Sequence, residues 1–242
     1  SMTQQGEREE HGMIEVTNLR KSFRGRPVLK DVSFTAEKGR ITCLIGENGA
    51  GKSTVLKAIM GLIPSDGGRI LIDGRALAGR DLYTAAAFIP DRLAMPGGMR
   101  LKDALSFMQT FYPNWNARRA EELMAFFRLD PAAKIGDLSK GTAAKFNLVL
   151  GFALDVSYVL MDEPFAGIDL FSREQIAKVF ASDLIEERGV LMTTHEIGEL
   201  EHLVDKAVLL KDGVIVRGLD CEQLRLTEGK SVIDVMREVY AP

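Results

Sequence analysis

One short motif constrains this chain more than any other, because residues 46–53 run Gly-Glu-Asn-Gly-Ala-Gly-Lys-Ser. The spacing Gly-x-x-x-x-Gly-Lys-Ser is typical of a phosphate-binding loop. The apolar run 41–45 precedes it and predicts a buried strand, and residues 53–60 have the character of a helix. A strand, a glycine-rich loop and a helix in this order form the context that gives the motif its meaning.

The residue types inside the loop suit an anion. Gly46, Gly49 and Gly51 allow a tight turn and a close approach of backbone to ligand. Backbone N–H groups and the helix N-terminus, with about half a positive charge, point at the anion. Lys52 adds a full charge for the outer phosphates, and the Ser53 hydroxyl suits Mg²⁺. The alternative, a glycine-rich turn with a surface lysine, is disfavoured by the flanking strand and helix.

Composition limits the class of protein. The 242 residues carry a net charge of −3, with 46% hydrophobic and 27% charged residues, which predicts a packed core. That length suits one large domain or a core with an inserted subdomain. The acidic balance disfavours direct nucleic-acid binding, although a local basic patch stays open. The most apolar run, 146–154, is shorter than the ~20 residues of a membrane span.

Cysteine content and the N-terminal residues favour a cytosolic location. Cys43 and Cys221 lack metal-ligand spacing, which predicts reduced thiols packed in the core. The N-terminus is rich in Gln, Glu and Arg and does not resemble a secretory signal. We expect residues 1–12 to form a flexible tail.

The rest of the pattern predicts an α/β fold. Residues 13–37 alternate apolar and polar positions, as antiparallel strands do. Further strands are expected at 69–74, 158–161 and 190–194, and helices at 172–188 and 196–203. Asp212-Gly213 divides two strand-like halves of 207–216, which predicts a hairpin. Alternating strands and helices imply a mostly parallel sheet covered on both faces.

Helical spacing replaces this pattern between residues 91 and 155. Strand character returns afterwards, so we expect this block to be inserted within the sheet domain. Inside it, Pro113 ends one helix and an Asn caps the next. The aromatic residues in 111–115 are explained either as core filling or as a docking surface.

Two carboxylates follow the predicted strand 158–161. Asp162, at a strand end beside a phosphate loop, can hold Mg²⁺ through water. Glu163 can orient a water for attack on a γ-phosphate. The alternative is an acidic pair that starts a loop, and the phosphate loop upstream favours the functional interpretation.

His195 follows the predicted strand 190–194. A neutral imidazole there can hydrogen-bond a γ-phosphate and respond to its loss. Alone, it would be explained as a loop histidine. Because ligands bind at the carboxyl ends of strands in open α/β sheets, its position favours a functional role.

A second helix start lies at residues 138–142, Leu-Ser-Lys-Gly-Thr. Ser139 is a good N-cap for a helix that runs to about residue 154, and Gly141 permits close backbone approach. The segment is explained either as a capped helix alone or as a second anion site.

Together these motifs resemble those of the ATPase subunit of ABC transporters. The residues are Asn-Gly-Ala-Gly-Lys-Ser-Thr at 48–54, Leu-Ser-Lys-Gly-Thr at 138–142, Val-Leu-Met-Asp-Glu-Pro at 159–164, Ala-Gly-Ile-Asp at 166–169 and Thr-Thr-His at 193–195. The resemblance covers about residues 13–225 and leaves 226–242 as a C-terminal helical extension. It implies a P-loop NTPase core, a small antiparallel β subdomain and a helical subdomain inserted at about 91–155.

The resemblance also implies roles for single residues. ATP would be bound by Phe23, Gly46, Asn48, Gly49, Ala50, Gly51, Lys52, Ser53, Thr54, Ser139 and Gly141. Mg²⁺ would be held by Ser53, Asp162 and Asp91, and the catalytic groups would be Lys52, Glu163 and His195. Asp169 would contact a second subunit in a head-to-tail dimer, which encloses ATP between one subunit's phosphate loop and the other's 138–142 segment. For Phe23, the local apolar pattern alone favours the core, whereas the resemblance places it on adenine.

Three positions depart from the family pattern. Lys140 and Thr142 replace the third and fifth residues of Leu-Ser-Gly-Gly-Gln, and Lys140 can add positive charge towards a partner's ATP. Asp91 stands where the family places a Gln that contacts the metal and the membrane partner. Residues 166–169 are a loose version of Ser-Ala-Leu-Asp.

The predicted function is ATP hydrolysis that powers a separate integral-membrane permease. The working unit is a homodimer or heterodimer of ATPase subunits, peripheral on the inner face of the cell membrane. The 91–155 block is the expected docking face, with Asp91 at its hinge. The run 111–115, with 138–141, is similar to a branch that serves small export systems.

Two alternatives stay open at this point. A soluble ABC-type ATPase acting on DNA or ribosomes usually carries two cassettes, a long coiled coil or zinc cysteines. A small-molecule kinase with the same loop needs a substrate lid with arginines.

Overall fold

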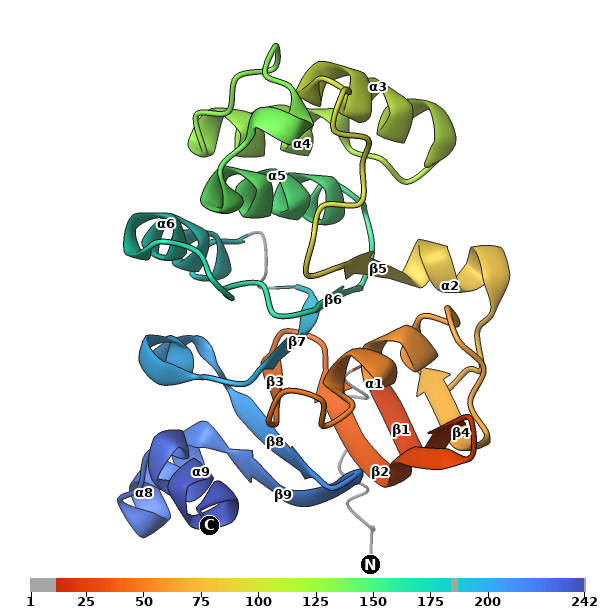
Figure 1. The fold of residues 1–242 in the computed structure, drawn as a ribbon, viewed down its shortest axis with the longest axis vertical. Coiled ribbons are helices and arrows are strands. Elements are labelled where there is room, and N and C mark those ends of the chain that lie inside the picture. Colours follow the sequence, from red (N-terminus) through yellow and green to blue (C-terminus); the bar gives the residue numbers. More distant parts are fainter. Residues whose placement is uncertain (1–11, 184–186, 242) are drawn as a thin grey trace, which may run out of the picture.

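The structure, a computed structural model, describes residues 12–183 and 187–241 (Figure 1). Within these two ranges, one sheet of nine strands has the order β4-β1-β2-β9-β8-β3-β7-β6-β5. The strands are β1 (Met13–Phe23), β2 (Arg26–Glu37), β3 (Ile41–Ile45), β4 (Gly67–Ile72), β5 (Ala86–Ile89), β6 (Tyr158–Met161), β7 (Gly189–Thr194), β8 (Lys206–Lys211) and β9 (Val214–Asp220). The tail predicted for 1–12 lies, except for Gly12, outside the described residues.

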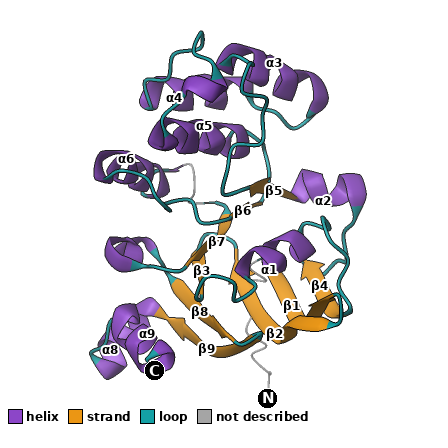
Figure 2. Ribbon diagram, in the orientation of Figure 1, coloured by secondary structure: helices purple, strands orange, loops and turns teal. Residues whose placement is uncertain are grey.

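Helices surround this sheet (Figure 2). They are α1 (Lys52–Ile59), α2 (Gly79–Ala85), α3 (Leu101–Phe111), α4 (Ala117–Phe126), α5 (Lys140–Phe152), α6 (Leu170–Phe180), α8 (Cys221–Glu228) and α9 (Val232–Tyr240), with 3-10 turns η1 (Ile135–Asp137) and η2 (Gly198–Leu203). The helix predicted at 196–203 is instead the 3-10 turn η2. The helix predicted at 172–188 corresponds to α6, which begins at Leu170 and ends at Phe180, and residues 184–186 of that prediction lie outside the described residues.

The parallel part of the sheet is the core of the molecule. Strands β8, β3, β7, β6 and β5 pair in parallel with one another, in this order. Every residue of β3, β6 and β7 is buried, as expected for strands covered on both faces. The predicted α/β class with a mostly parallel core is confirmed. All carboxyl ends of this group meet at one edge, where the phosphate loop begins.

The antiparallel part is also as predicted. β1 pairs antiparallel with both β2 and β4. β8 and β9 form a hairpin whose turn residues, Asp212 and Gly213, have φ of +52° and +81°. Positive φ at both positions is the geometry that matches the twist of a tight hairpin.

The helical block α3–α5 is connected between β5 and β6 and lies at the top of Figure 1, where α5 packs against β5. Asn116 caps α4 by accepting a hydrogen bond of 3.0 Å from the Arg119 N–H, as predicted. Phe111 is 65% exposed and Tyr112 is also exposed. The core-filling explanation is therefore wrong for these two aromatic residues.

Two short helices close the chain. α8 packs against β9 and α9 against β8, next to each other in Figure 1. The limits 13–225 and 226–242 stay predictions, and α8 spans the boundary between them.

Candidate nucleotide site

The phosphate loop connects β3 to α1 with left-handed glycines. Gly49 has φ of +83° and Gly51 of +104°, conformations that favour glycine. A Cβ on Gly51 would lie 2.8 Å from Leu29, so the loop also packs tightly on β2. The helix begins directly at Lys52, and the predicted Ser53 and Thr54 lie half-buried in its first turn. The predicted strand, loop and helix are thus present.

Lys52 is buried inside this loop. Its ammonium donates hydrogen bonds of 2.7 Å to the Gly46 carbonyl and 3.0 Å to the Glu47 carbonyl. It also lies 3.3 Å from the Glu163 carboxylate. A buried charge is stabilised only when it is paired and hydrogen-bonded, and Lys52 is both.

The Glu163 carboxylate contacts both Lys52 and His195. Its second carboxylate oxygen lies 3.0 Å from Nδ1 of His195, whose side chain is 38% exposed. Glu163 has φ of +46°, a conformation that non-glycine residues seldom adopt and that clusters at functional sites. Three groups that are far apart in the sequence, Lys52, Glu163 and His195, therefore converge at the carboxyl edge of the sheet.

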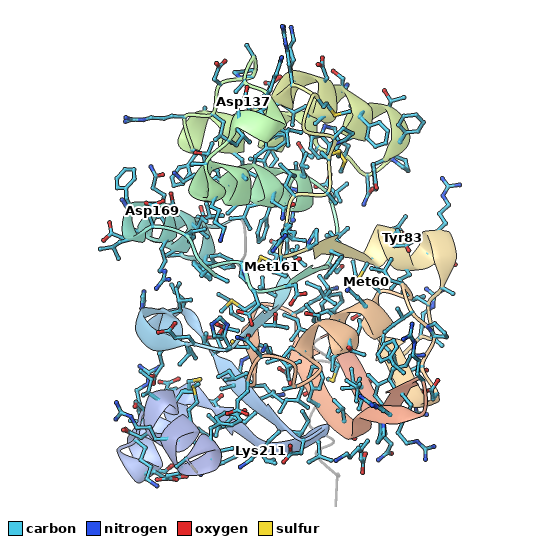
Figure 3. All side chains as sticks on the ribbon, in the orientation of Figure 1. Met60, Tyr83, Asp137, Met161, Asp169 and Lys211 are labelled. Atoms are coloured by element: carbon cyan, nitrogen blue, oxygen red, sulfur yellow. The ribbon has the colours of Figure 1, made fainter. Side chains whose placement is uncertain are left out.

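Thr193 is the first residue of the Thr-Thr-His motif at 193–195, and the sequence alone assigned it no role. Its hydroxyl donates a 2.7 Å hydrogen bond to the buried Asp162 and accepts one of 2.9 Å from the Glu163 N–H. The register pairs Met161 with Met192, which brings the residues after them together. Met161, labelled in Figure 3, marks this end of β6. The contact between the Thr193 hydroxyl and Asp162 could be predicted only from the register in which β6 pairs with β7.

A cleft of about 590 Å³ opens beside this cluster. It is lined by Asn48, Asp91, Arg92, Leu93, Ile135, Lys140, Ala143, Ala144, Asn147, Glu163, Pro164, Ala166, Ile168 and His195. The predicted Asp91 and Lys140 thus face the same space as Glu163. Asn147 of α5 donates a 2.7 Å hydrogen bond to the Pro90 carbonyl and so ties the helical block to the segment that carries Asp91.

The segment 138–142 and Asp169 contact each other within one subunit. Ser139 caps α5, accepting a 3.2 Å hydrogen bond from the Thr142 N–H. Asp169 caps α6 through a 2.8 Å bond from the Ser172 N–H, which holds the pKa of Asp169 below its usual value. A Cβ on Gly141 would overlap the Ser172 hydroxyl and lie 2.7 Å from Asp169. Gly141 is therefore needed for this packing, and Figure 3 shows Asp169 at the start of α6.

Phe23 ends β1 and is 44% exposed, so its core interpretation is wrong. The Lys21 ammonium lies 5.3 Å from its ring centre, within cation–π range. The exposed ring is free to stack, and an adenine contact stays a prediction.

The donors near the loop fit Mg²⁺. The described residues contain no group of three or more His, Cys, Asp and Glu side chains arranged for a metal. Mg²⁺ usually keeps several waters and binds one or two carboxylates together with phosphate oxygens. The Ser53 hydroxyl and the buried Asp162 at the strand end are such a donor set.

A model of the ABC transporter family matches residues 29–166, which is more than half of the chain. The chain belongs to the ABC transporter family. Its similarity extends over most of the length of curated relatives. ABC transporter ATP-binding protein YtrB of Bacillus subtilis (strain 168) is 31% identical over 88% of this chain and 74% of that protein. Lipopolysaccharide export system ATP-binding protein LptB of Escherichia coli (strain K12) is 30% identical over 88% of this chain and 92% of that protein.

A solved structure of this ABC family gives the same result. It is described as the ATP binding subunit of an ABC transporter, is 29% identical and has a TM-score of 0.84, with 94% of this chain and 99% of that chain covered. The present chain is an ABC-type ATP-binding subunit and an ATPase. In the part of the chain that the structure describes, no helix has the length and apolar character of a membrane span.

Proposed function

We propose that this ABC subunit binds ATP with Mg²⁺ at residues 46–54 and hydrolyses it to drive a separate membrane permease. One observation carries the proposal: the Glu163 carboxylate lies 3.3 Å from the Lys52 ammonium and 3.0 Å from His195. A carboxylate fixed between a phosphate-binding lysine and an imidazole is in position to accept a proton from an attacking water.

Each group has a distinct role in this proposal. Lys52 exchanges its contacts with the loop carbonyls for the outer phosphates, where its charge stabilises the transition state. Glu163 orients the water and takes its proton. His195 donates to the γ-phosphate and loses this contact when phosphate leaves. A bound Mg²⁺ would neutralise phosphate charge, held by Ser53 and Asp162 with Asp91 as a third candidate.

ATP is enclosed, in this proposal, by two ATPase subunits arranged head to tail. Lys140 is exposed at the start of α5 and lines the cleft, so its charge is available to a nucleotide. Ser139 and Gly141 would present the helix N-terminus to the partner's γ-phosphate, and Asp169 would contact the partner subunit. The second subunit is either a copy of this chain or a related one.

An apolar groove supports docking of the permease. It has a volume of about 250 Å³ and is lined by Met60, Leu62, Tyr83, Ala86, Ala87, Phe88, Pro90, Leu93, Ala94, Met95, Met108, Tyr112, Asn147, Leu150, Gly151 and Leu154. Leu62, Tyr83 and Tyr112 are exposed at its rim, and Pro90 adjoins Asp91. An apolar groove beside the cleft suits a short helix of a membrane protein. This contact would hold the subunit at the inner face of the membrane, and export stays a prediction.

Glu163→Gln tests the catalytic assignment directly. With ATP and Mg²⁺, this variant should form a stable dimer in size-exclusion chromatography, with kcat lowered by about 10²–10³ on the scale of other positioned groups. Glu121→Gln removes the same charge from an exposed position on α4 and should retain normal turnover. Full activity of Glu163→Gln would refute the base assignment.

A further inference from the structure

The C-terminal helix α9 contacts the base of the phosphate loop, although none of the sequence motifs includes it. The phenolic oxygen of Tyr240, the last residue of α9, lies 3.0 Å from the Ile45 carbonyl and 3.0 Å from the Leu210 carbonyl. Ile45 ends β3 immediately before the loop, and Leu210 lies on the adjacent β8. A tyrosine hydroxyl has one proton to donate, so the two carbonyls share it, and the hydroxyl holds these two strands together at this point.

The bridged carbonyls adjoin the first residue of the loop. A Cβ on Gly46 would lie 2.9 Å from the Leu210 carbonyl oxygen, so the backbone of Gly46 rests against β8 at this point. The Gly46 carbonyl in turn accepts the 2.7 Å hydrogen bond from Lys52. The Tyr240 hydroxyl is therefore separated from the buried ammonium only by the strand ends and Gly46.

Further contacts fix α9 at both of its ends. The Val232 N–H donates a 2.8 Å hydrogen bond to Glu201 of η2, the turn that follows His195. At the other end, the Lys211 ammonium donates a 2.8 Å hydrogen bond to the Val239 carbonyl. Figure 3 labels Lys211 beside the C-terminal helices. α9 therefore connects the histidine segment to the β8 end next to the loop.

Between α9 and the loop lies a hollow of about 440 Å³. It is lined by Gly46, Glu47, His195, Ile233, Met236, Arg237, Tyr240 and Ala241. Burial raises the pKa of the Tyr240 hydroxyl, and the charge of Glu47 adds to the rise. The hydroxyl accordingly stays protonated, and a donor, at physiological pH.

We propose that Tyr240 is a positioning residue for nucleotide binding, holding the end of β3 and the Gly46 backbone in the geometry that Lys52 and the phosphates require. This inference rests on the proposed role of residues 46–54. It adds the C-terminal helix to the ATP site, through a hydroxyl bonded to the strands from which the loop begins.

Tyr240→Phe tests the inference, because it keeps the ring and removes only the hydroxyl. Losing one hydrogen bond of ordinary strength predicts a rise of about 2- to 10-fold in the Kd and KM for Mg-ATP. We expect kcat to change less than twofold. Hydrogen exchange without nucleotide should be faster in peptides covering residues 44–52.

Tyr158→Phe is the matched control. Tyr158 is fully buried and donates its hydroxyl to Asp73, at the opposite end of β6 from the site. Its loss should lower the Tm while leaving the KM for ATP unchanged. Lys211→Met loosens the end of α9 without touching the hydroxyl, and it should raise the KM in the same direction by a smaller factor.

Two results would overturn the inference: an unchanged Kd and unchanged exchange in Tyr240→Phe, or equal KM shifts in Tyr240→Phe and Tyr158→Phe. If the unaltered protein failed to bind Mg-ATP, that result would refute the proposed function and not the role of Tyr240. Hydrogen exchange without nucleotide would then still decide whether Tyr240 holds the loop. If Tyr240→Phe failed to fold, Lys211→Met would carry the same comparison.

Discussion

The Thr193 hydroxyl donates a 2.7 Å hydrogen bond to the Asp162 carboxylate across two parallel strands. The same oxygen accepts the Glu163 N–H at 2.9 Å, so one hydroxyl fixes two adjacent carboxylate residues. The bond to Asp162 is buried and the bond from the Glu163 N–H is partly buried, so their loss would leave polar groups without partners.

Thr193→Val should therefore destabilise the protein by about 1–3 kcal/mol in urea unfolding, the cost of leaving buried groups unpaired. Its kcat should also fall, because Asp162 and Glu163 lose their common support. Thr42→Val is a matched control: the Thr42 hydroxyl is buried in β3 with no hydrogen-bond partner among the described residues. That change should be neutral or stabilising, and equal losses in both variants would contradict this account.

Lys52→Ala should weaken ATP binding about 10- to 150-fold, the range expected for a hydrogen bond that involves a charge. Isothermal titration calorimetry with Mg-ATP measures this directly. Lys57→Ala, an exposed position later in the same helix, removes an equal charge and should bind ATP normally. Similar weakening in the two variants would show that net charge, rather than the loop contact, matters.

Gly51→Ala should lower the free energy of unfolding by about 1–3 kcal/mol or more. Gly51 combines a φ of +104° with a Cβ position 2.8 Å from Leu29, so strain and overlap act together. Gly49 has a positive φ but open space around its Cβ position, so Gly49→Ala should lower the free energy of unfolding less than Gly51→Ala does. Gly218, which has open space around its Cβ position, should accept Ala within about 0.5 kcal/mol. Chemical denaturation of the three variants measures the free energy of unfolding of each, and the loss should be largest for Gly51→Ala and smallest for Gly218→Ala.

The two buried thiols predict a loss of stability at alkaline pH. Burial raises the pKa of Cys221 to about 11 and raises that of Cys43 further. In the unfolded chain both ionise near pH 8.5, so above that pH the unfolded state binds fewer protons than the folded state. Stability is therefore intact below about pH 8.5 and falls as the pH rises towards the folded pKa, by at most about 1.4 kcal/mol per pH unit for each thiol.

Urea unfolding at pH 8 and pH 10.5 measures this effect. Cys221→Ala removes one of the two groups and should show a shallower decrease between these pH values. A decrease identical to that of the unaltered protein would exclude a contribution from Cys221.

Much of the site could be predicted from the sequence because local chemistry determines it. The glycine spacing of 46–51 fixes the loop, and a carboxylate or histidine directly after a buried strand must lie at the carboxyl edge of a parallel sheet. That reasoning predicts that Lys52, Glu163 and His195 lie at the same edge, and the structure places their ionisable groups within 3.3 Å and 3.0 Å of one another through Glu163.

The contacts that could not be predicted depend on register and on distance along the chain. Thr193 meets Asp162 because Met161 pairs with Met192, and residue composition does not encode that pairing. Tyr240 reaches Ile45 across 195 residues of sequence separation. Apolar patterning placed Phe23 in the core, whereas an aromatic residue beside the turn of a hairpin, here between β1 and β2, can lie on the surface.

The close packing of Gly141 against Ser172 and Asp169 has a mechanical consequence. The starts of α5 and α6 pack against each other with no room for a methyl group at Gly141, so neither can shift here without displacing the other. Helix α5 is bonded in turn through Asn147 to the Pro90 carbonyl. In the proposed dimer, a displacement of Asp169 by the partner subunit would therefore reach the segment that enters the helical block.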